Sequence, residues 1–293
     1  MNILSTNVIF VSHKGGRMIY LPTLLPLMEN SEQIYTEINY DKRFTGMNDV
    51  TRDEEHIHDF FEIYLNLNGN VSFLVEDHVY PIHRGDIIVT APNEIHRCLY
   101  HSNCVHEHFC IWIRALPFAT DPLRAQFKKN KLLVLPDDEK ERIIEACFAL
   151  YKSRIEGPLR SFAAIKSFFE ILDILCADRY DTIEAQSLPS NFSEIIRYIS
   201  QNYTDPTCNV SHICDTFYLS KSTICRWFRR YFQTTPSDYI EAKRFSEAKN
   251  LLGAGQSVQS ACLGSGFTDC SYFIMRFRKK FGITPYQYQH NFL

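Results

Sequence analysis

Several side chains near residue 60 have the types and the spacing of a ligand site. His56, His58 and Glu62 are separated by even numbers of residues, and Tyr64 and Asn66 continue the same parity. Because alternate residues of a β-strand point to one face, we expect these polar side chains to lie together. Imidazoles combined with a carboxylate suit Fe, Mn, Ni or Zn ions. An organic effector pocket and a structural polar cluster are the alternatives.

A second set of side chains suits nucleic acid. Ile224 and Phe228 are four residues apart, which predicts the inward face of a helix. The outward stripe of that helix then contains Ser222, Cys225, Arg226 and Arg229. Arginine can pair bidentately with guanine in the major groove, and Lys or Arg can bind phosphates. A second outward stripe further along the chain contains Ser271, Ile274, Met275 and Arg278.

The two stripes belong to an internal repeat with an offset of 49 residues. Thr235-Pro236-x-x-Tyr239 matches Thr284-Pro285-x-x-Tyr288, and the Phe and Arg residues before these motifs also correspond. Each copy is predicted to form helix, turn, helix, with N-caps at Asn209, Ser220, Ser257 and at Thr268 or Asp269. A connecting helix, about 237–252, spans ~24 Å at 1.5 Å per residue. It would hold two recognition helices near the ~34 Å spacing of one DNA turn.

Charge is divided unevenly along the 293 residues. Residues 1–185 carry 19 Lys and Arg against 27 Asp and Glu, a net charge of −8. Residues 186–293 carry 12 against 7, a net charge of +5, so the formal charge of −3 is a cancellation. A basic end joined to an acidic remainder is typical of a protein that meets DNA at that end only.

Composition excludes several protein classes. Apolar residues make up 45% and charged residues 22% of the chain, which is typical of a globular protein rather than a disordered or fibrous one. No apolar run has membrane-spanning length, and the N-terminus lacks the pattern of a signal peptide. We therefore expect a cytoplasmic protein without membrane contact, whose ten cysteines are reduced.

Short alternating runs over the first ~115 residues predict an antiparallel sandwich or barrel. Phe61 to Leu67 forms one strand, Asn68-Gly69-Asn70 a turn, and Val71 to Val75 the return strand. From Asp137 the apolar period changes to that of helices. Two helices are expected before a short linker at 187–191, with the domain boundary near residue 186.

The two helices have apolar stripes that must be buried. In the first helix, the stripe includes Ile143, Ile144, Cys147 and Leu150, and in the second Leu159, Phe162, Phe169, Leu172 and Leu175. Packing on the strand domain and a dimer interface are equally weighted interpretations.

The repeat resembles the AraC/XylS family of bacterial transcription regulators. The resemblance lies in Leu219-Ser220-Lys221-Ser222 through Arg229-Arg230, and above all in Gly266-Phe267-Thr268-Asp269-x-x-Tyr272-Phe273 through Thr284-Pro285-x-x-Tyr288. It covers the C-terminal third and implies a seven-helix, double helix-turn-helix DNA-binding domain. By position, the base-facing residues would be Ser222, Cys225 and Arg226, and then Ser271, Ile274 and Met275.

The second unit departs from that family pattern. Met275 stands where members often have arginine, and Arg276 is one position further, a rotation of ~100° around the helix. We therefore predict that Arg226 supplies most of the hydrogen-bonded base readout. The second unit would contribute thymine-methyl contacts and phosphate anchoring. Further candidate DNA-binding residues are Arg229, Arg230, Arg278 and Lys279.

The N-terminal residues resemble the two motifs of a cupin barrel. The first motif is His56-x-His58-x-x-x-Glu62, and the second runs from Gly85-Asp86 to Pro92-Asn93-Glu94-Ile95-His96 without the usual intervening glycine. The resemblance implies that His56, His58, Glu62 and His96 converge. Metal is weighed below an organic effector, bound by these residues and Tyr64, because cupin-like sensor domains of this regulator family mostly bind no metal. For His101, His106 and His108, an exposed strand is favoured over a second ligand site.

The sequence as a whole predicts an α+β multidomain protein. It would contain a cupin-like antiparallel β-barrel (1–136), a helical hairpin for dimerisation (137–185) and an all-α DNA-binding domain with two helix-turn-helix units (186–293). We expect a regulator of transcription rather than an enzyme, without a cofactor, that acts as an effector-controlled activator. Its partners would be double-stranded DNA, a small molecule, a second copy and, for an activator, RNA polymerase. A ligand-independent regulator with a filled barrel and a metal-dependent cupin enzyme are the alternatives.

Overall fold

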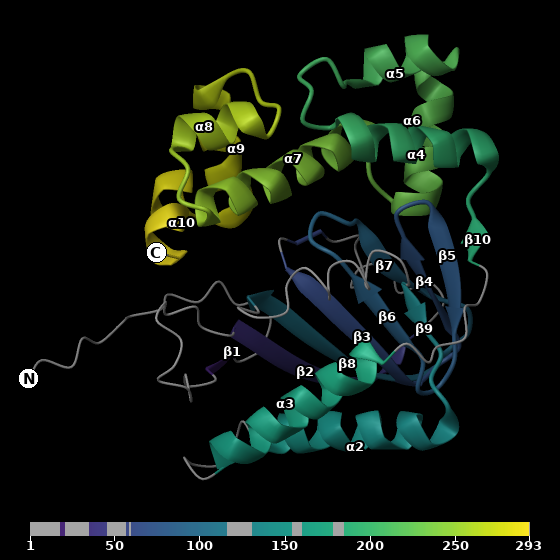
Figure 1. Ribbon diagram of the computed structural model, residues 1–293. Helices are drawn as coiled ribbons and strands as arrows, with labels where there is room; N and C mark the ends of the chain where they lie inside the picture. The colour runs from purple at the N-terminus through teal and green to yellow at the C-terminus, as the bar shows by residue number, and fades with distance from the viewer. Residues whose placement is uncertain are drawn as a thin grey trace, which may run out of the picture. The chain divides into compact units, whose positions relative to one another are not determined.

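The computed structural model describes residues 18–20, 35–45, 57–58, 60–115, 131–153, 160–177 and 185–292. The chain divides into two compact units, one formed by Gly16–Ile196 and one that starts at Arg197. The elements of each unit are labelled in Figure 1.

Two antiparallel sheets form the first unit, as the alternating runs predict. One sheet has the strand order β1-β2-β8-β3-β6-β9 and the other β10-β5-β4-β7. The first sheet consists of β1 (Met18–Tyr20), β2 (Tyr35–Thr45), β3 (Phe61–Asn68), β6 (Ile87–Thr90), β8 (Cys104–Ala115) and β9 (Leu132–Leu133). The second consists of β4 (Val71–Val75), β5 (His78–Ile82), β7 (His96–Tyr100) and β10 (Gln186–Ser187).

The predicted return strand lies in the other sheet. β3 pairs with β6 and β8, whereas β4 pairs with β5 and β7. The turn at Asn68-Gly69-Asn70 therefore carries the chain between sheets. Gly69 has a φ of +127°, which favours glycine, and a Cβ there would lie 3.0 Å from the ring of His106. Both sheets contribute to one apolar cluster, which contains Tyr64 and Ile88 from the first sheet and Val71, Phe73 and Val75 from the second.

The alternation along β3 separates two environments. Phe61, Ile63, Leu65 and Leu67 pack in one cluster with α2 (Asp137–Ser153) and α3 (Arg160–Cys176), which cover the outer face of the first sheet (Figure 1). Glu62, Tyr64 and Asn66 have the opposite parity and are all buried. The polar parity predicted from the sequence thus points to the interior, between the sheets.

The helical hairpin buries its stripe on the strand domain. Ile143 and Leu150 of α2 and Phe168 and Leu172 of α3 all belong to the cluster beneath the first sheet. Phe162 and Phe169 of α3 remain outside it, with 60% and 38% of their surface exposed. Leu159 lies outside the described residues. Among the described residues of α3, the exposed apolar face is therefore the one with Phe162, not the one with Leu172.

The segment expected as a linker is paired with the first unit. Gln186 and Ser187 form β10 against Val79 and His78, and the amide of Leu188 donates to the carbonyl of Asp77. The side chain of Leu188 is buried. The next helix, α4 (Ser190–Asn202), crosses the division between the two units.

The second unit consists of helices with well-defined ends. After α4 come α5 (Val210–Phe217), α6 (Lys221–Phe232), α7 (Pro236–Gly253), α8 (Val258–Gly264), α9 (Cys270–Phe281) and α10 (Pro285–Phe292). Side-chain N-caps at Asn209, Ser220, Ser257 and Asp269 confirm the predicted helix starts. The seven helices within 185–292 agree with the number that the family resemblance implies.

Duplicated aromatic contacts stabilise the two helix-turn-helix units. Phe228 of α6 contacts Phe232 at a ring-centroid distance of 5.9 Å and Tyr239 of α7 at 5.1 Å. At the repeat positions, Phe277 contacts Phe281 at 4.6 Å and Tyr288 at 5.7 Å. The repeated spacing therefore produces the same two ring contacts in each copy. Among the described residues, no helix combines the length and apolarity needed to cross a bilayer.

Candidate nucleic-acid interface and sensor site

Helix α6 presents the first predicted stripe to solvent. Ile224 and Phe228 are fully buried, and this fixes the rotation of the helix. On the other side, Ser222, Arg226, Arg229 and Arg230 are exposed, and Cys225 is half-buried. Ser220 caps the helix by accepting from the amide of Thr223 at 3.2 Å. An exposed arginine-rich face on a capped helix is available for base and phosphate contacts.

Helix α9 presents the second predicted stripe. Ser271, Ile274, Met275, Arg278 and Lys279 are all exposed, opposite the buried Phe273 and Phe277. The same five residues line a shallow groove together with Gly282 and Thr284. Met275 and Ile274 expose 58% and 38% of their surface, so the groove has an apolar part suited to methyl groups.

Arg276 faces away from this stripe, as its one-residue displacement predicts. Its guanidinium forms a two-point ion pair with Glu241 of α7, with Nε donating to Oε1 at 2.9 Å and Nη2 to Oε2 at 2.5 Å. Tyr272 also donates to Glu241. This ion pair raises the pKa of Arg276 and holds the side chain against α7. Arg276 therefore links α9 to α7 and does not belong to the exposed stripe of α9.

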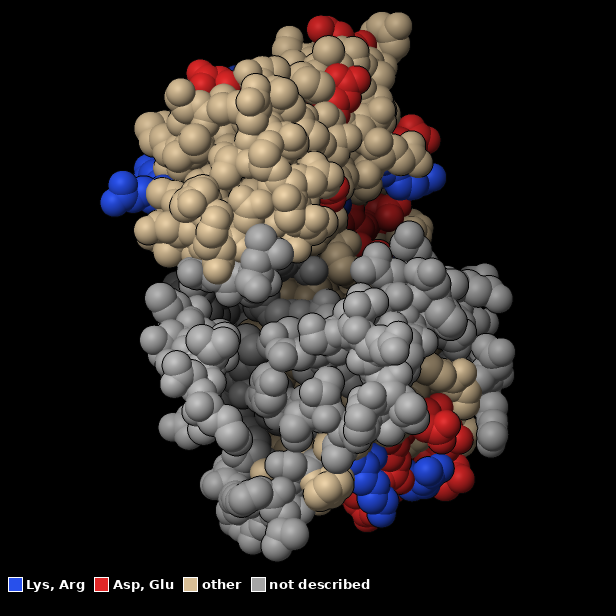
Figure 2. All heavy atoms as spheres, turned by 60° about the vertical axis from the view of Figure 1, so that its left-hand side comes forward, with Lys and Arg blue, Asp and Glu red and all other residues tan. Residues whose placement is uncertain are grey.

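Charged side chains are unevenly distributed over the face that carries α8, α9 and α10. Figure 2 views the second unit from that side, and the visible Lys and Arg side chains lie toward the flanks of a mostly uncharged face.

Sequence reasoning missed a clamp inside the second unit. Arg244 of α7 donates from Nε to the carbonyl of Tyr203 at 2.7 Å, and from Nη2 to those of Asp205 and Cys208 at 2.9 and 3.0 Å. These contacts fasten the loop between α4 and α5 to α7. Gly266 packs against the same loop. The three acceptors lie 36 to 41 residues before Arg244 in the sequence, so the fold is needed to bring the contacts together.

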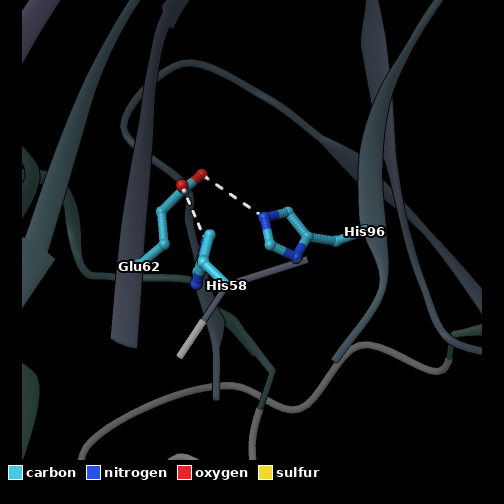
Figure 3. A group of neighbouring side chains, drawn as sticks. All are labelled: His58, Glu62 and His96. Atoms are coloured by element: carbon cyan, nitrogen blue, oxygen red, sulfur yellow. Dashed lines mark hydrogen bonds and ion pairs between the residues drawn. The ribbon is translucent and has the colours of Figure 1, made fainter. Parts of the chain in front are cut away.

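Glu62 is the centre of the polar cluster in the first unit. It lies on the interior side of β3, is 3% exposed, and accepts from the indole Nε1 of Trp112 on β8 at 2.7 Å. His58 Nε2 lies 3.2 Å from Oε2 of Glu62, and His96 Nε2 lies 3.8 Å from Oε1. All three side chains point toward one another (Figure 3).

Backbone carbonyls orient both imidazoles. His58 Nδ1 lies 2.8 Å from the carbonyl of Phe60, and His96 Nδ1 lies 2.9 Å from that of Glu94. Because a carbonyl only accepts, each Nδ1 must carry the hydrogen and each Nε2 faces the carboxylate. The ligand atoms of His58, Glu62 and His96 all lie within 4.8 Å of one another. His56, the fourth predicted ligand, lies outside the described residues.

Tyr64 lies on the same face but has a different partner. Its hydroxyl lies 2.5 Å from Nε2 of His106, and burial raises its pKa well above the usual value. The structure therefore brings three of the predicted effector residues together and places the fourth described one beside β8. A surface pocket at one end of the sheets is lined by other residues, from 67–72, 81–84 and His101.

The exposed-strand interpretation of the later histidines is wrong for two of them. His106 is 1% exposed, and its ring and that of His108 are stacked at 4.7 Å on the interior side of β8. Burial, followed by the neighbouring imidazole and Arg43, lowers the pKa of His106 to about 3. Burial and Arg43 lower the pKa of His108 to about 4. Both rings are neutral packing groups at pH 7, and His101 is the exposed member of these three histidines.

Two family models match separate parts of the chain. An AraC-like ligand binding domain matches residues 43–169, and a helix-turn-helix domain matches residues 213–291. The first match covers the strands from β3 to β9 and most of the helical hairpin, and the second covers both α6 and α9.

Similar proteins include activators of transcription. The transcriptional activator RhaR of Mannheimia succiniciproducens is 23% identical over 252 residues, covering 81% of this chain and 87% of its own length. RhaS of Pectobacterium carotovorum is 23% identical over 249 residues, covering 80% and 87%. Among solved structures, ToxT from Vibrio cholerae is 16% identical with a TM-score of 0.38, covering 88% of this chain and 98% of its own.

Proposed function

The chain belongs to the AraC family of DNA-binding transcription regulators, and on that premise we propose that it is an activator controlled by a small-molecule effector. Residues 186–293 bind double-stranded DNA, and residues 1–136 sense the effector. The observation that carries the DNA-binding part is the pair of exposed stripes on α6 and α9, each held by the same buried phenylalanine spacing. The relatives RhaR and RhaS are described as activators, which supports the direction of control.

The two recognition helices divide the readout of the site. Arg226 on α6 donates to base edges, whereas Ile274 and Met275 on α9 contact thymine methyl groups, because Arg276 is held by Glu241. The connecting helix α7 has 18 residues. It therefore extends over roughly 27 Å and can hold both helices at neighbouring major grooves.

The experiment that tests this division measures binding to the DNA upstream of the gene for this chain. Fluorescence anisotropy would compare that fragment with a shuffled sequence at fixed salt. Arg226→Ala should reduce the preference for the specific fragment by about 1–3 kcal/mol, and Met275→Ala by less. Arg276→Ala is a matched control for loss of an arginine outside the stripe. A greater loss of preference in Met275→Ala than in Arg226→Ala would contradict the assignment.

Effector control operates through the first unit. The support for a ligand is the match to an AraC-like ligand binding domain and the interior cluster of His58, Glu62 and His96. Binding of the effector changes the population of arrangements in which two DNA-binding domains reach adjacent half-sites. The alternative of a filled barrel has its own support, because Tyr64 and His106 already bond to each other in the interior.

Two copies of the chain associate through residues 137–185, and as an activator the dimer contacts RNA polymerase. The face of α3 with Phe162 and Phe169 supports this interface, because residues seven apart share one side of a helix. Both side chains keep substantial exposed area in the single chain. Large exposed apolar side chains at helical spacing are typical of a protein–protein contact.

A further inference from the structure

We propose that the first unit binds one divalent transition-metal ion of the Zn²⁺ or Fe²⁺ kind, with Nε2 of His58, the carboxylate of Glu62 and Nε2 of His96 as its protein ligands (Figure 3). The inference rests on the proposed function only in treating this unit as the sensor. The sequence pattern favours an organic effector over a metal ion, whereas the geometry of the three side chains favours a metal ion.

The three ligand atoms converge at distances that suit an ion. Two ligands bound at about 2.0–2.2 Å to a tetrahedral ion lie about 3.4 Å apart. The two distances from Glu62 to His58 and His96 are 3.2 and 3.8 Å, which bracket that value. Small side-chain movements therefore suffice to close the site around an ion.

The orientation of the imidazoles points to the same conclusion. Ligating histidines usually donate their second ring N–H to a carbonyl or carboxylate, which fixes the ring and its tautomer. Both His58 and His96 do this, through Nδ1 to Phe60 and Glu94. Their Nε2 lone pairs then converge with the acceptor oxygens of Glu62. A proton can bridge one imidazole to the carboxylate, whereas a metal ion accepts from all three groups at once.

Burial and the contact with Trp112 support a built site. His58, Glu62 and His96 are 7%, 3% and 0% exposed, so the carboxylate needs compensation inside the protein. The indole of Trp112 donates to Oε2 at 2.7 Å and makes Trp112 a positioning residue. Two imidazoles and one carboxylate are a common set for Zn²⁺ and Fe²⁺, and they leave coordination positions open for water or an effector.

The test uses the full chain, purified without a histidine tag and treated with a chelator. Zn²⁺ binding would be measured by calorimetry and Co²⁺ binding by visible absorption. We expect one ion per chain, and a Co²⁺ spectrum without the intense bands of thiolate ligands, which separates this site from the ten cysteines. Glu62→Gln and His96→Gln should each lower Zn²⁺ affinity by more than roughly 100-fold, beyond the usual effect of an outer-shell partner.

Two further variants separate ligation from packing. His106→Gln changes another buried imidazole on the same side of the sheet and should leave Zn²⁺ affinity unchanged. Trp112→Phe should lower affinity about 10- to 100-fold while one ion still binds. Circular dichroism and thermal unfolding without metal would show which variants remain folded. The test needs only one of the two ligand variants, Glu62→Gln or His96→Gln, to remain folded.

The inference is overturned if the unsubstituted chain binds no ion, or if Glu62→Gln and His96→Gln bind Zn²⁺ as tightly as it does. DNA binding would be measured on the same samples. If the chain binds DNA but no metal ion, the metal site is refuted and the proposed function is not. If the chain binds the metal ion but not DNA, the proposed function is refuted and the metal site is not.

Discussion

Gly266 occupies a position at which any side chain would be strained. Its φ is +90°, and a Cβ there would lie 2.8 Å from the carbonyl oxygens of Tyr203 and Thr204 and 2.9 Å from Nε of Arg244. Backbone oxygens cannot move away without breaking the contacts that Arg244 makes with the same loop. The glycine that precedes Phe267 in the family motif is therefore required by the packing of the second unit.

Gly266→Ala should lower the free energy of unfolding of the second unit by roughly 1–3 kcal/mol, because positive φ and close contact both penalise a methyl group. Gly253→Ala is the matched control, since a Cβ there meets nothing within 4 Å and the residue ends a helix. That control should be neutral or slightly stabilising. Urea unfolding followed by circular dichroism would compare the variants, and equal midpoints would refute the argument.

Single residues also show what the sequence could and could not predict. The stripes on α6 and α9 follow from helical spacing, and the exposed Arg226 and Met275 agree with it. The partners of Glu62 do not follow from spacing, because Trp112 lies on another strand 50 residues away. Likewise, the rotation of Arg276 away from the stripe is predictable, but its partner Glu241 is not. Local periodicity thus predicts the face of an element on which a side chain lies, whereas its contact partner depends on the tertiary structure.

At the scale of elements, the helices of the second unit and their N-caps were predictable from the sequence, and the pairing of the strands was not. A turn of the Asn-Gly kind favours a hairpin locally, yet β3 and β4 enter different sheets because β8 and β6 occupy both edges of β3. The alternation of side chains along β3 does not depend on this pairing, since each residue faces the same side whichever strand is the neighbour. The shared side of Glu62, Tyr64 and Asn66 was therefore predictable, whereas the structure was needed to show that this side is the interior and which strands surround it.

Helix α3 has one face in the core and another that we propose as the dimer interface, and two variants test this assignment. Phe162→Glu should weaken dimerisation without unfolding the first unit, because Phe162 is 60% exposed. Leu172→Glu should instead destabilise the unit by several kcal/mol, about the cost of a buried unpaired charge, because Leu172 is 6% exposed. Light scattering for mass and thermal unfolding for stability would distinguish the two effects. An unchanged dimer in Phe162→Glu would exclude this face of α3.

At the scale of the whole molecule, the positive charge is concentrated where DNA would bind. The surplus of +5 in residues 186–293 is largely carried by exposed Arg226, Arg229, Arg230, Arg278 and Lys279. In the acidic remainder, by contrast, exposed cations are often paired with carboxylates, as Arg84 is with Glu141 at 2.6 Å. Only the cations of the basic part should accordingly displace condensed counterions from the DNA phosphates on binding.

This division predicts how salt dependence responds to substitution. A plot of log binding constant against log salt concentration should become less steep by about 0.9 for each phosphate contact removed. Arg229→Gln and Lys279→Gln should each produce a change of this size with specific and with shuffled DNA. Arg84→Gln removes the same charge from the first unit and should leave the slope unchanged. If Arg84→Gln altered the slope as much as Arg229→Gln did, the phosphate contacts would not be confined to the basic part, and the assignment of the α6 stripe would fail.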